Sequence, residues 1–302
     1  MSDQSTLDPA SRASDRIADL WWILFVVSAV VFAVVVALLL VGALRGRGGE
    51  EPDRRPSPRA TRLVAVAGVV VPTVVVISLF FLSVASLPAV SPGGKNARMT
   101  IEVVGRQWFW DVYYRNRTIR TSNEIRVPVG VPVELRVRSD DVIHSLWVPR
   151  LNRKIDMIPG RTSSIVIDAR EPGVYRGQCA EFCGLQHANM AFLVVAAAPA
   201  RFRRWLDDQE APAPPPSRTF VENGCDGCHE LRTGAARGSF GPDLSHFGSR
   251  LTLASGTLTN TRAHLAAWLR DPQAVKPGAK MPDLRLADED ILRLVDYLEG
   301  LK

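Results

Sequence analysis

All four cysteines of this 302-residue chain lie in two short motifs, and both motifs carry further side chains that bind metals. In the first motif, Cys179 and Cys183 are followed closely by His187 and Met190. Thiolate, thioether and imidazole ligands together favour copper over hard cations. A second imidazole, His144, follows a strand-like segment upstream, so it can project from a strand end toward the later motif. The pattern predicts a copper site built from two thiols, two imidazoles and one thioether.

Three other sites compete for the same residues. A disulfide between Cys179 and Cys183 suits an oxidising compartment, but it gives the histidine and the methionine no role. A structural zinc site has no need of a thioether. A mononuclear blue-copper centre uses one cysteine, whereas this motif supplies two. Two bridging thiolates suit two copper ions, and this interpretation gives every residue of the motif a function.

The second motif is Cys225-Asp-Gly-Cys228-His229, which is typical of covalent haem attachment. The two thiols can add to the vinyl groups of a haem, and the adjacent histidine can bind the iron. A redox pair of the thioredoxin type is the alternative, but it does not need the histidine. Met281 lies downstream as a candidate second axial ligand, and a His/Met pair raises the reduction potential of haem iron. We expect His246, by contrast, to be a surface or loop residue.

Two apolar segments precede these motifs, and each is long enough to cross a bilayer. Leu20–Leu44 and Leu63–Val90 contain no charged residue, and each exceeds the ~20 apolar residues that a membrane helix needs. A cleaved signal peptide is the alternative for the first segment, but it would have a shorter apolar core, a basic flank and a small-residue cleavage site. Pro72 lies inside the second segment, where a kink or a neighbouring helix must accommodate it. The sequence predicts a retained two-helix hairpin.

The segment between the two predicted helices, residues 45–62, is rich in arginine, and short arginine-rich loops stay in the cytoplasm. We therefore expect the hairpin, residues 20–91, to leave residues 1–19 and everything from residue 92 onward outside the cytoplasm. An extracytoplasmic compartment also permits the cysteine chemistry described above. The arginines of the loop are Arg45, Arg47, Arg54, Arg55, Arg59 and Arg62.

The rest of the sequence divides into two soluble domains and a linker. Residues 92–210 contain short, β-branched, alternating segments separated by glycine and proline, which is typical of a β-sandwich. Residues 211–218 are rich in proline and predict an extended linker that rises about 3 Å per residue. Residues 219–302 contain two helix-like segments, Ala263–Leu269 and Asp288–Leu301, and have little apolar core, so a haem would stabilise them. The predicted fold class is a membrane-anchored multidomain chain.

The first motif resembles cytochrome c oxidase subunit II. The shared features are Cys-x-Glu-x-Cys-Gly-x-x-His-x-x-Met, the setting Asp-x-x-His-Ser-x-Trp-Val-Pro upstream, and the helical hairpin before both. The resemblance implies a cupredoxin-like β-barrel with a dinuclear copper A centre. The two cysteines would bridge the coppers, each histidine would bind one copper, and the methionine and a backbone carbonyl would be axial ligands. The implied ligands are His144, Cys179, Glu181 through its carbonyl, Cys183, His187 and Met190.

The same resemblance extends to three further positions. The family uses the carboxylate at Glu181 on a magnesium ion at the interface with the catalytic subunit. The run that contains Trp108 and Trp110 resembles the aromatic patch where electrons enter from cytochrome c, although core packing is the simpler role for two tryptophans. The family commonly carries a glutamate at the mouth of a proton pathway, seven residues before the proline of the second helix. This chain has Ala65 there, which leaves proton uptake through this subunit in doubt.

The C-terminal domain resembles class I cytochromes c in the runs Gly241–Leu244 and Leu265–Pro272 and in its closing helix. Together, the two halves resemble subunit II of caa-type cytochrome oxidases, in which a cytochrome c is fused behind the copper domain. This implies electron flow from a cytochrome c or a bc-type complex, through a covalent haem and copper A, to subunit I. The membrane helices of this chain contain no histidine that could bind a haem–copper centre. Oxygen reduction to water and proton pumping would therefore belong to subunit I. The expected partners are subunits I and III in a bacterial inner membrane.

Other functions remain open at this point. The same relay could serve nitric oxide reduction, and a copper-delivery protein would bind copper reversibly but would have no use for a haem domain. Quinol oxidase homologues lack the copper ligands that are present here. The net charge is only +6, and no dense basic patch is interleaved with aromatic residues, which excludes nucleic acid as an expected partner.

Overall fold

The computed structural model consists of two compact units, Asp15–Val90 and the combination of Met1–Ser14 with Ser91–Lys302. The first unit holds the apolar helices, and the second holds both soluble domains. The described residues are 4–45, 57–90, 97–115, 117–232, 236–237 and 240–302.

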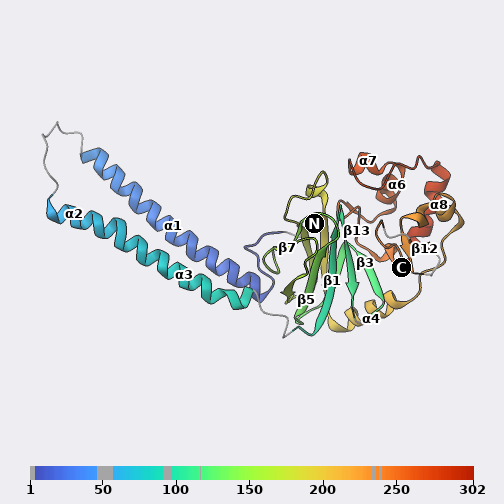
Figure 1. Cartoon of the computed structure of the whole chain (residues 1–302), viewed down its shortest axis with the longest axis horizontal. Coiled ribbons are helices and arrows are strands. Elements are labelled where there is room, and N and C mark those ends of the chain that lie inside the picture. The colour runs from blue at the N-terminus through green and yellow to red at the C-terminus, as the bar shows by residue number, and fades with distance from the viewer. Residues whose placement is uncertain (1–3, 46–56, 91–96, 116, 233–235, 238–239) are drawn as a thin grey trace. The chain divides into compact units, whose positions relative to one another are not determined.

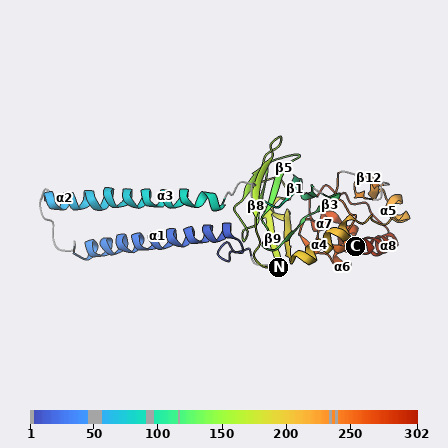
Figure 2. The same ribbon diagram turned by 90° about the horizontal axis from the view of Figure 1, so that it is seen from below.

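Two apolar helical segments make up most of the first unit (Figures 1 and 2). The first is α1 (Arg12–Arg45), and the second runs continuously through α2 (Pro58–Ala65), η1 (Val66–Val70) and α3 (Val71–Val90). Both are long and apolar enough to cross a membrane. Most of their side chains are exposed, as lipid-facing side chains would be. The predicted arginine-rich loop lies largely outside the described residues.

Pro72 follows a single π-helical turn. Residues 66–70 form the π-helix η1, and the α-helix resumes at Val71. A proline has no N–H and its ring crowds the carbonyl of the preceding turn in a regular α-helix. A local π adjustment is one way in which a membrane helix satisfies the backbone groups that a proline frees. The second apolar helix therefore continues past the proline without ending.

The β domain contains two five-stranded sheets, in the orders β3-β2-β1-β5-β8 and β4-β10-β9-β6-β7. Most neighbouring strands are antiparallel, but β1 pairs with β5 and β10 pairs with β4 in parallel. The strands are β1 Met99–Arg106, β2 Phe109–Tyr114, β3 Ile119–Ser122, β4 Glu124–Pro128, β5 Val133–Ser139, β6 His144–Trp147, β7 Ile155–Met157, β8 Ser163–Ile167, β9 Gly173–Cys179 and β10 Ala191–Ala197.

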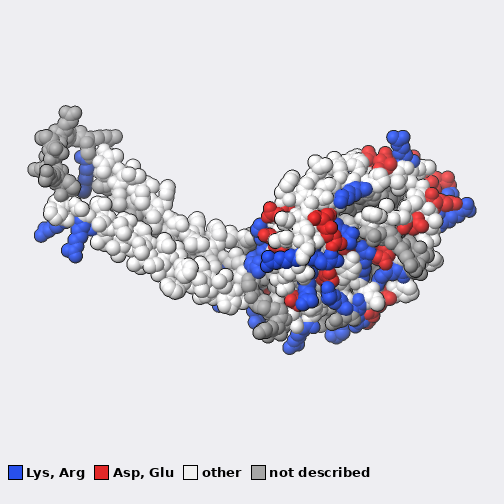
Figure 3. Space-filling model, viewed as in Figure 1, with Lys and Arg blue, Asp and Glu red and all other residues white. Residues whose placement is uncertain are grey.

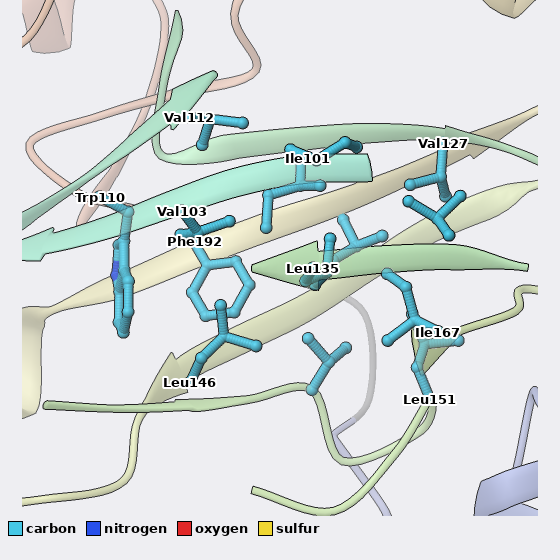
Figure 4. Close-up of a cluster of buried hydrophobic side chains, with 14 of the residues drawn as sticks. Ile101, Val103, Trp110, Val112, Val127, Leu135, Leu146, Leu151, Ile167 and Phe192 are labelled. Atoms are coloured by element: carbon cyan, nitrogen blue, oxygen red, sulfur yellow. The ribbon is translucent and has the colours of Figure 1, made fainter. Parts of the chain in front are cut away.

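Side chains from both sheets fill one core (Figure 4). Ile101 and Leu135 come from one sheet, Leu146 and Phe192 come from the other, and all four are buried. The helix α4 (Pro199–Glu210) follows β10 and packs Phe202, Trp205 and Leu206 against this core. The predicted cupredoxin-like β-sandwich is confirmed, and its packed core holds the strand ends in fixed positions.

The C-terminal domain is helical and closes around a smaller core. Its apolar side chains come mainly from α5, α6 and α8, and include Phe220, Leu265 and Leu294. Thr261 caps α6, because its side chain accepts a hydrogen bond from the amide of His264. The elements are α5 Arg218–Glu222, η4 Cys225–Gly227, β11 Glu230–Leu231, β12 Ala236–Arg237, η5 Phe247–Ser249, β13 Thr252–Leu253, β14 Leu258–Thr259, α6 Arg262–Arg270, α7 Pro272–Val275 and α8 Asp288–Gly300.

The proline-rich segment packs along the C-terminal domain. Its carbonyls at Ala211 and Pro215 accept hydrogen bonds from the His246 ring and the Tyr297 hydroxyl. His246 lies in a turn, as the predicted surface or loop position allows, but it is only 3% exposed and so is not a surface residue. Both ring nitrogens of His246 contact backbone carbonyls, which allows the polar ring to be buried. The segment therefore joins the two domains as a packed strap.

Charged side chains are distributed unevenly over the surface (Figure 3). On the face shown, lysine and arginine intermingle with aspartate and glutamate over the soluble unit. The two apolar helices present an uncharged surface along most of their length. The mixture of both signs on the soluble unit agrees with the modest net charge of +6.

Candidate functional site

The end of one sheet brings the first cysteine motif together with His144. His144 is the first residue of β6, and Cys179 is the last residue of β9. The two strands pair antiparallel, with Leu146 opposite Cys179. The loop that follows β9 passes through the short helix η3 (His187–Asn189) and returns into β10. Strand register therefore places the distant histidine beside the cysteine motif.

The two thiols and the two imidazoles form one cluster. The Sγ atoms of Cys179 and Cys183 lie 3.8 Å apart. The Nδ1 atom of His144 lies 3.9 Å from the first sulfur, and the Nδ1 atom of His187 lies 3.7 Å from the second. Each sulfur thus has its own imidazole, while the two sulfurs face each other. Both cysteines are free, so they do not form the disulfide considered above.

Two weaker donors lie beside the cluster, one near each sulfur. The Sδ atom of Met190 lies 3.7 Å from the Cys183 sulfur, and the carbonyl oxygen of Glu181 lies 3.1 Å from the Cys179 sulfur. The methionine and both cysteines are buried. Each thiol is therefore accompanied by one imidazole and one weaker donor. Two soft metal ions bridged by two thiolates fit this arrangement, and a tetrahedral zinc ion does not use all of it.

Electrostatics keep the two thiols from ionising together. The contact with the Cys183 thiol lowers the pKa of Cys179 to about 3. The same contact, together with burial, raises the pKa of Cys183. Like charges at this distance cannot both form without a compensating cation. A bound metal cation would supply that compensation, so the pair is suited to a positively charged occupant.

Asp141 orients one of the imidazoles, a role that the sequence analysis did not assign. Its Oδ1 lies 2.8 Å from His144 Nε2, and its Oδ2 accepts a hydrogen bond of 2.7 Å from the amide of Gln107. Burial opposes ionisation, but the hydrogen bond from His144 prevails and lowers the pKa of Asp141 to about 2. A carboxylate on Nε2 leaves Nδ1 to face the sulfurs. The spacing of a carboxylate three residues before a ligand histidine is the signal that could have identified it.

The two tryptophans of the predicted aromatic patch have different surroundings. Trp110 is fully buried in the core and its ring lies 5.0 Å from that of Phe192. Trp108 is half-buried, and its Nε1 donates a 3.0 Å hydrogen bond to the carbonyl of Cys183. Gly184, with φ +110°, permits this approach, because a Cβ there would lie 3.1 Å from the indole. The structure therefore connects Trp108 directly to the metal-ligand loop.

The second cysteine motif opens into a cavity of about 580 Å³. Cys225, Cys228, His229 and Met281 all line it, and its volume is within the range of cofactor pockets. His229 Nδ1 lies 2.8 Å from the carbonyl of Pro242, which leaves Nε2 available for a metal. The apolar lining includes Phe220, Leu244, Phe247, Leu265, Trp268 and Leu298.

The residues of this cavity fit a covalently attached haem. Gly241 keeps the space beside His229 open, because a Cβ at this position would lie 2.6 Å from the imidazole Cε1. Both thiols are free, and burial raises the pKa of Cys225 to about 11. A neutral thiol among apolar side chains is the group that would add to a vinyl substituent. The cavity therefore brings together two thiols, an imidazole, a thioether and an apolar wall, which are the groups that a covalent haem would use.

The haem cavity also adjoins the β domain within the same compact unit. Gln107, Trp108 and Asp141 of the β domain line the cavity together with the cysteine motif. Hydrogen bonds also join the domains: the amide of Ala191 donates to the Ser255 carbonyl at 3.0 Å. Trp108 thus contacts the metal-ligand loop on one side and the haem cavity on the other.

The carboxylate of Glu181, predicted to bind magnesium, points away from the thiol cluster. Its Oε2 lies 3.4 Å from the ammonium of Lys154, and its side chain is 44% exposed. The backbone carbonyl of this residue faces the cluster instead. The side chain and the carbonyl of Glu181 can therefore serve different ions.

Comparisons with known proteins agree with this division. Residues 114–197 match the family described as cytochrome c oxidase subunit II, periplasmic domain, and residues 217–302 match the family described as cytochrome c. Cytochrome c oxidase subunit 2 of Alkalihalophilus pseudofirmus is 32% identical, over 99% of this chain and 91% of the relative. The Bacillus subtilis protein of the same name is 28% identical, over 99% of this chain and 92% of the relative.

One solved structure is similar to part of the chain. The periplasmic domain of subunit II of cytochrome oxidase from Bradyrhizobium japonicum is 31% identical, covers 37% of this chain and 94% of that chain, and has a TM-score of 0.36. The matches to the relatives span the apolar helices as well as both soluble domains. The chain therefore belongs to the cytochrome c oxidase subunit 2 family, as a membrane-anchored component of a haem–copper oxidase whose extracytoplasmic part carries a fused cytochrome c domain.

Proposed function

We propose that this chain passes electrons from an upstream donor through a covalent c-type haem to a dinuclear copper A centre, and from there to subunit I of the oxidase. The observation that carries the proposal is the meeting of two ligand sets within one compact unit, with Trp108 between them. Subunit I would reduce oxygen to water and pump protons. The donor would be a cytochrome c or a bc-type complex, and subunits I and III would be the membrane partners.

The residues of the β domain would hold the copper centre, whose chemistry is reversible one-electron transfer. The sulfurs, 3.8 Å apart, are placed to be shared by two metal ions. Asp141 holds the His144 ring through Nε2 and so fixes the direction of Nδ1. His144, both cysteines and Met190 are buried, which shields these side chains from water and restrains their movement. The proposed copper ligands are His144, Cys179, the Glu181 carbonyl, Cys183, His187 and Met190.

The C-terminal domain would hold the haem, which supplies the second one-electron carrier. Cys225 and Cys228 would form the covalent attachments, and His229 and Met281 would be the axial ligands. The hydrogen bond between His229 and the Pro242 carbonyl fixes the orientation of the imidazole. Gln273 donates a 2.8 Å hydrogen bond to the carbonyl of Met281 and restrains that loop. Both ligands are therefore positioned by contacts of the chain itself.

Trp108 supports a direct route between the two carriers. Its indole lines the haem cavity and hydrogen-bonds to the Cys183 carbonyl. Trp110 lies behind it in the core, with its ring 6.1 Å from the His144 ring. We propose Trp108 as the residue through which electrons enter the copper centre. We propose that Trp110 supports the ligand histidine, in addition to the role in electron entry that the resemblance implies for both tryptophans.

The exposed Glu181 carboxylate supports a magnesium site at the boundary with subunit I. Its present contact, Lys154, would have to give way to the cation. We further propose a bacterial inner-membrane location in which both termini and both soluble domains are extracytoplasmic. The two apolar helices and the arginines that flank the intervening segment support this orientation.

Purification of the intact complex tests the function. We expect one covalent c-type haem and a mixed-valence two-copper signal in optical and electron paramagnetic resonance spectra. The complex should consume oxygen with reduced cytochrome c as the donor. Absence of either signal would contradict the relay, and consumption of nitric oxide in place of oxygen would reassign the terminal reaction.

A further inference from the structure

Lys276, which follows α7, is buried at the boundary between the two soluble domains. It is only 3% exposed, whereas lysine is almost never fully buried without a partner. Its Nζ donates hydrogen bonds to the backbone carbonyls of Trp108 at 3.2 Å, Asn189 at 2.9 Å and Ala254 at 3.3 Å. Three acceptors match the three N–H donors of an ammonium group. The side chain is therefore fully engaged by backbone oxygens.

The three carbonyls belong to three separate segments. Trp108 lies between β1 and β2 beside the haem cavity, and Asn189 directly precedes the proposed copper ligand Met190. Ala254 belongs to the turn between β13 and β14 of the haem domain. Lys276 thus connects the proposed electron entrance, the copper-ligand loop and the haem domain through one atom.

Neighbouring contacts fasten the same boundary. The Ser255 hydroxyl lies 3.2 Å from Asn123 Oδ1 and donates to the Ala191 carbonyl at 3.0 Å. On the other side of the loop, Gln186 hydrogen-bonds to the carbonyl of Pro277. The haem-domain segments around 255 and 277 therefore contact both ends of the stretch 186–191, which contains two proposed copper ligands.

An apolar side chain would be less costly than Lys276 if filling space were the only requirement. Burial of an ammonium group without a carboxylate carries a large desolvation cost. Among the residues that the structure describes, Lys276 makes no ion pair, and burial lowers its pKa to about 7. All three of its hydrogen bonds go to carbonyl oxygens, so the geometry points to a requirement for these three contacts together.

We propose that Lys276 is a positioning residue that holds the haem domain in register on the copper-ligand loop, so that electrons cross a fixed distance. This inference rests on the proposed function. Electron transfer between two buried centres falls steeply with their separation, and small displacements in such a site have large effects on rate. Without Lys276, the packed strap and the remaining contacts would keep the domains together but would not fix their spacing.

The test uses the intact oxidase with Lys276→Met, and Lys302→Met as the control at an exposed lysine. The haem is reduced rapidly, and electron arrival at the copper centre is followed by its absorbance. We expect transfer at least tenfold slower in Lys276→Met, with a rate that now decreases as solvent viscosity rises. The native complex and Lys302→Met should be fast and insensitive to viscosity. Haem content, copper content and both reduction potentials should be unchanged.

An unchanged rate would overturn the proposal. Loss of copper from Lys276→Met would also overturn it, since the side chain would then support the ligand loop and not the distance between the two centres.

Labelling of lysines in the native complex with an amine-reactive ester gives a second measurement that needs no variant. We expect Lys276 to react at least tenfold more slowly than Lys280 and Lys302, which are exposed. Equal reactivity would also overturn it. Missing haem or copper signals in the native complex would instead contradict the proposed function.

Discussion

The two proposed redox sites are built in opposite ways. In the β domain, strand register and a packed core bring the proposed ligand atoms to 3.1–3.9 Å of a sulfur before any metal is considered. In the C-terminal domain, the ligands line a cavity of about 580 Å³ and come from short turns and loops. The first site is a product of the fold. The second site is a space that its cofactor would fill, so we expect the fold there to depend on the cofactor.

The largest effect should follow the removal of both haem attachment points. In Cys225→Ala/Cys228→Ala, the haem is lost and the cavity has no apolar occupant. We expect the C-terminal domain to become sensitive to protease, while the β domain retains its copper signal. Haem staining and limited proteolysis measure this. Protease resistance of a haem-free C-terminal domain would show that the two sites do not differ in this way.

Cys183→Ser tests the other half of the comparison. The variant lacks one of the two sulfurs that face each other at 3.8 Å, so the dinuclear signal should disappear. The β domain should stay folded because its core lies mainly between the sheets, and the c-type haem should be unaffected. Copper-to-protein stoichiometry and circular dichroism are the measurements. A variant that still binds two coppers would remove Cys183 as a bridging ligand.

Asp141→Asn asks how far the copper site depends on contacts behind its ligands. The amide keeps the size of the side chain but lacks the charge that faces His144 Nε2. We expect copper affinity to fall by roughly 10- to 100-fold, as is common for such supporting groups. Competition with a chelator measures the affinity, and Asp208→Asn on the exposed face of α4 is the matched control. Equal affinities in the two variants would contradict the role of Asp141.

Met281→Ala examines the haem site in the same way. Loss of the thioether ligand should lower the reduction potential of the haem, because a His/Met pair raises it. A redox titration of the complex provides the measurement, with copper content as the internal reference. A potential equal to that of Leu292→Ala, an exposed position on α8, would exclude Met281 as an axial ligand.

The smallest effect concerns pH. Burial lowers the pKa of Lys276 to about 7 from 10.5, while the Cys183 charge opposes the shift. Between these values the unfolded chain binds more protons than the folded chain, so the contribution of this group to stability rises with pH. The thermal midpoint of native protein, measured by the copper absorbance, should therefore increase relative to Lys276→Met from pH 7 to pH 9. A constant difference would contradict the lowered pKa.

Short motifs made much of this molecule predictable, because their chemistry is encoded within a few residues. Cys225-Asp-Gly-Cys228-His229 needs only one turn of chain to present its groups. The apolar helices and the β-sandwich followed in the same way from length and alternation. The side chains that the motifs single out as copper and haem ligands lie in two clusters, and their role as ligands stays a prediction.

The contacts between domains could not be predicted from local patterns. Lys276 looks like any polar residue after a short helix, and only tertiary structure brings three carbonyls around it. The composition of the proline-rich segment predicts an extended spacer. In the structure, hydrogen bonds from His246 and Tyr297 hold this segment against the C-terminal domain. Trp108 and Trp110 are the same residue type two positions apart, and only burial distinguishes their surroundings.

The carbonyl of Cys183 accepts two hydrogen bonds, one from the Trp108 indole at 3.0 Å and one from the side-chain amide (Nε2) of Gln107 at 2.8 Å. Both donors withdraw electron density from the peptide unit that carries a proposed bridging sulfur. Hydrogen bonding around a metal-bound thiolate is one of the factors that set its potential. A molecule that displaced the Trp108 indole on docking would therefore change the driving force for reduction of the proposed copper centre. The same event would also alter the route by which the electron reaches that centre.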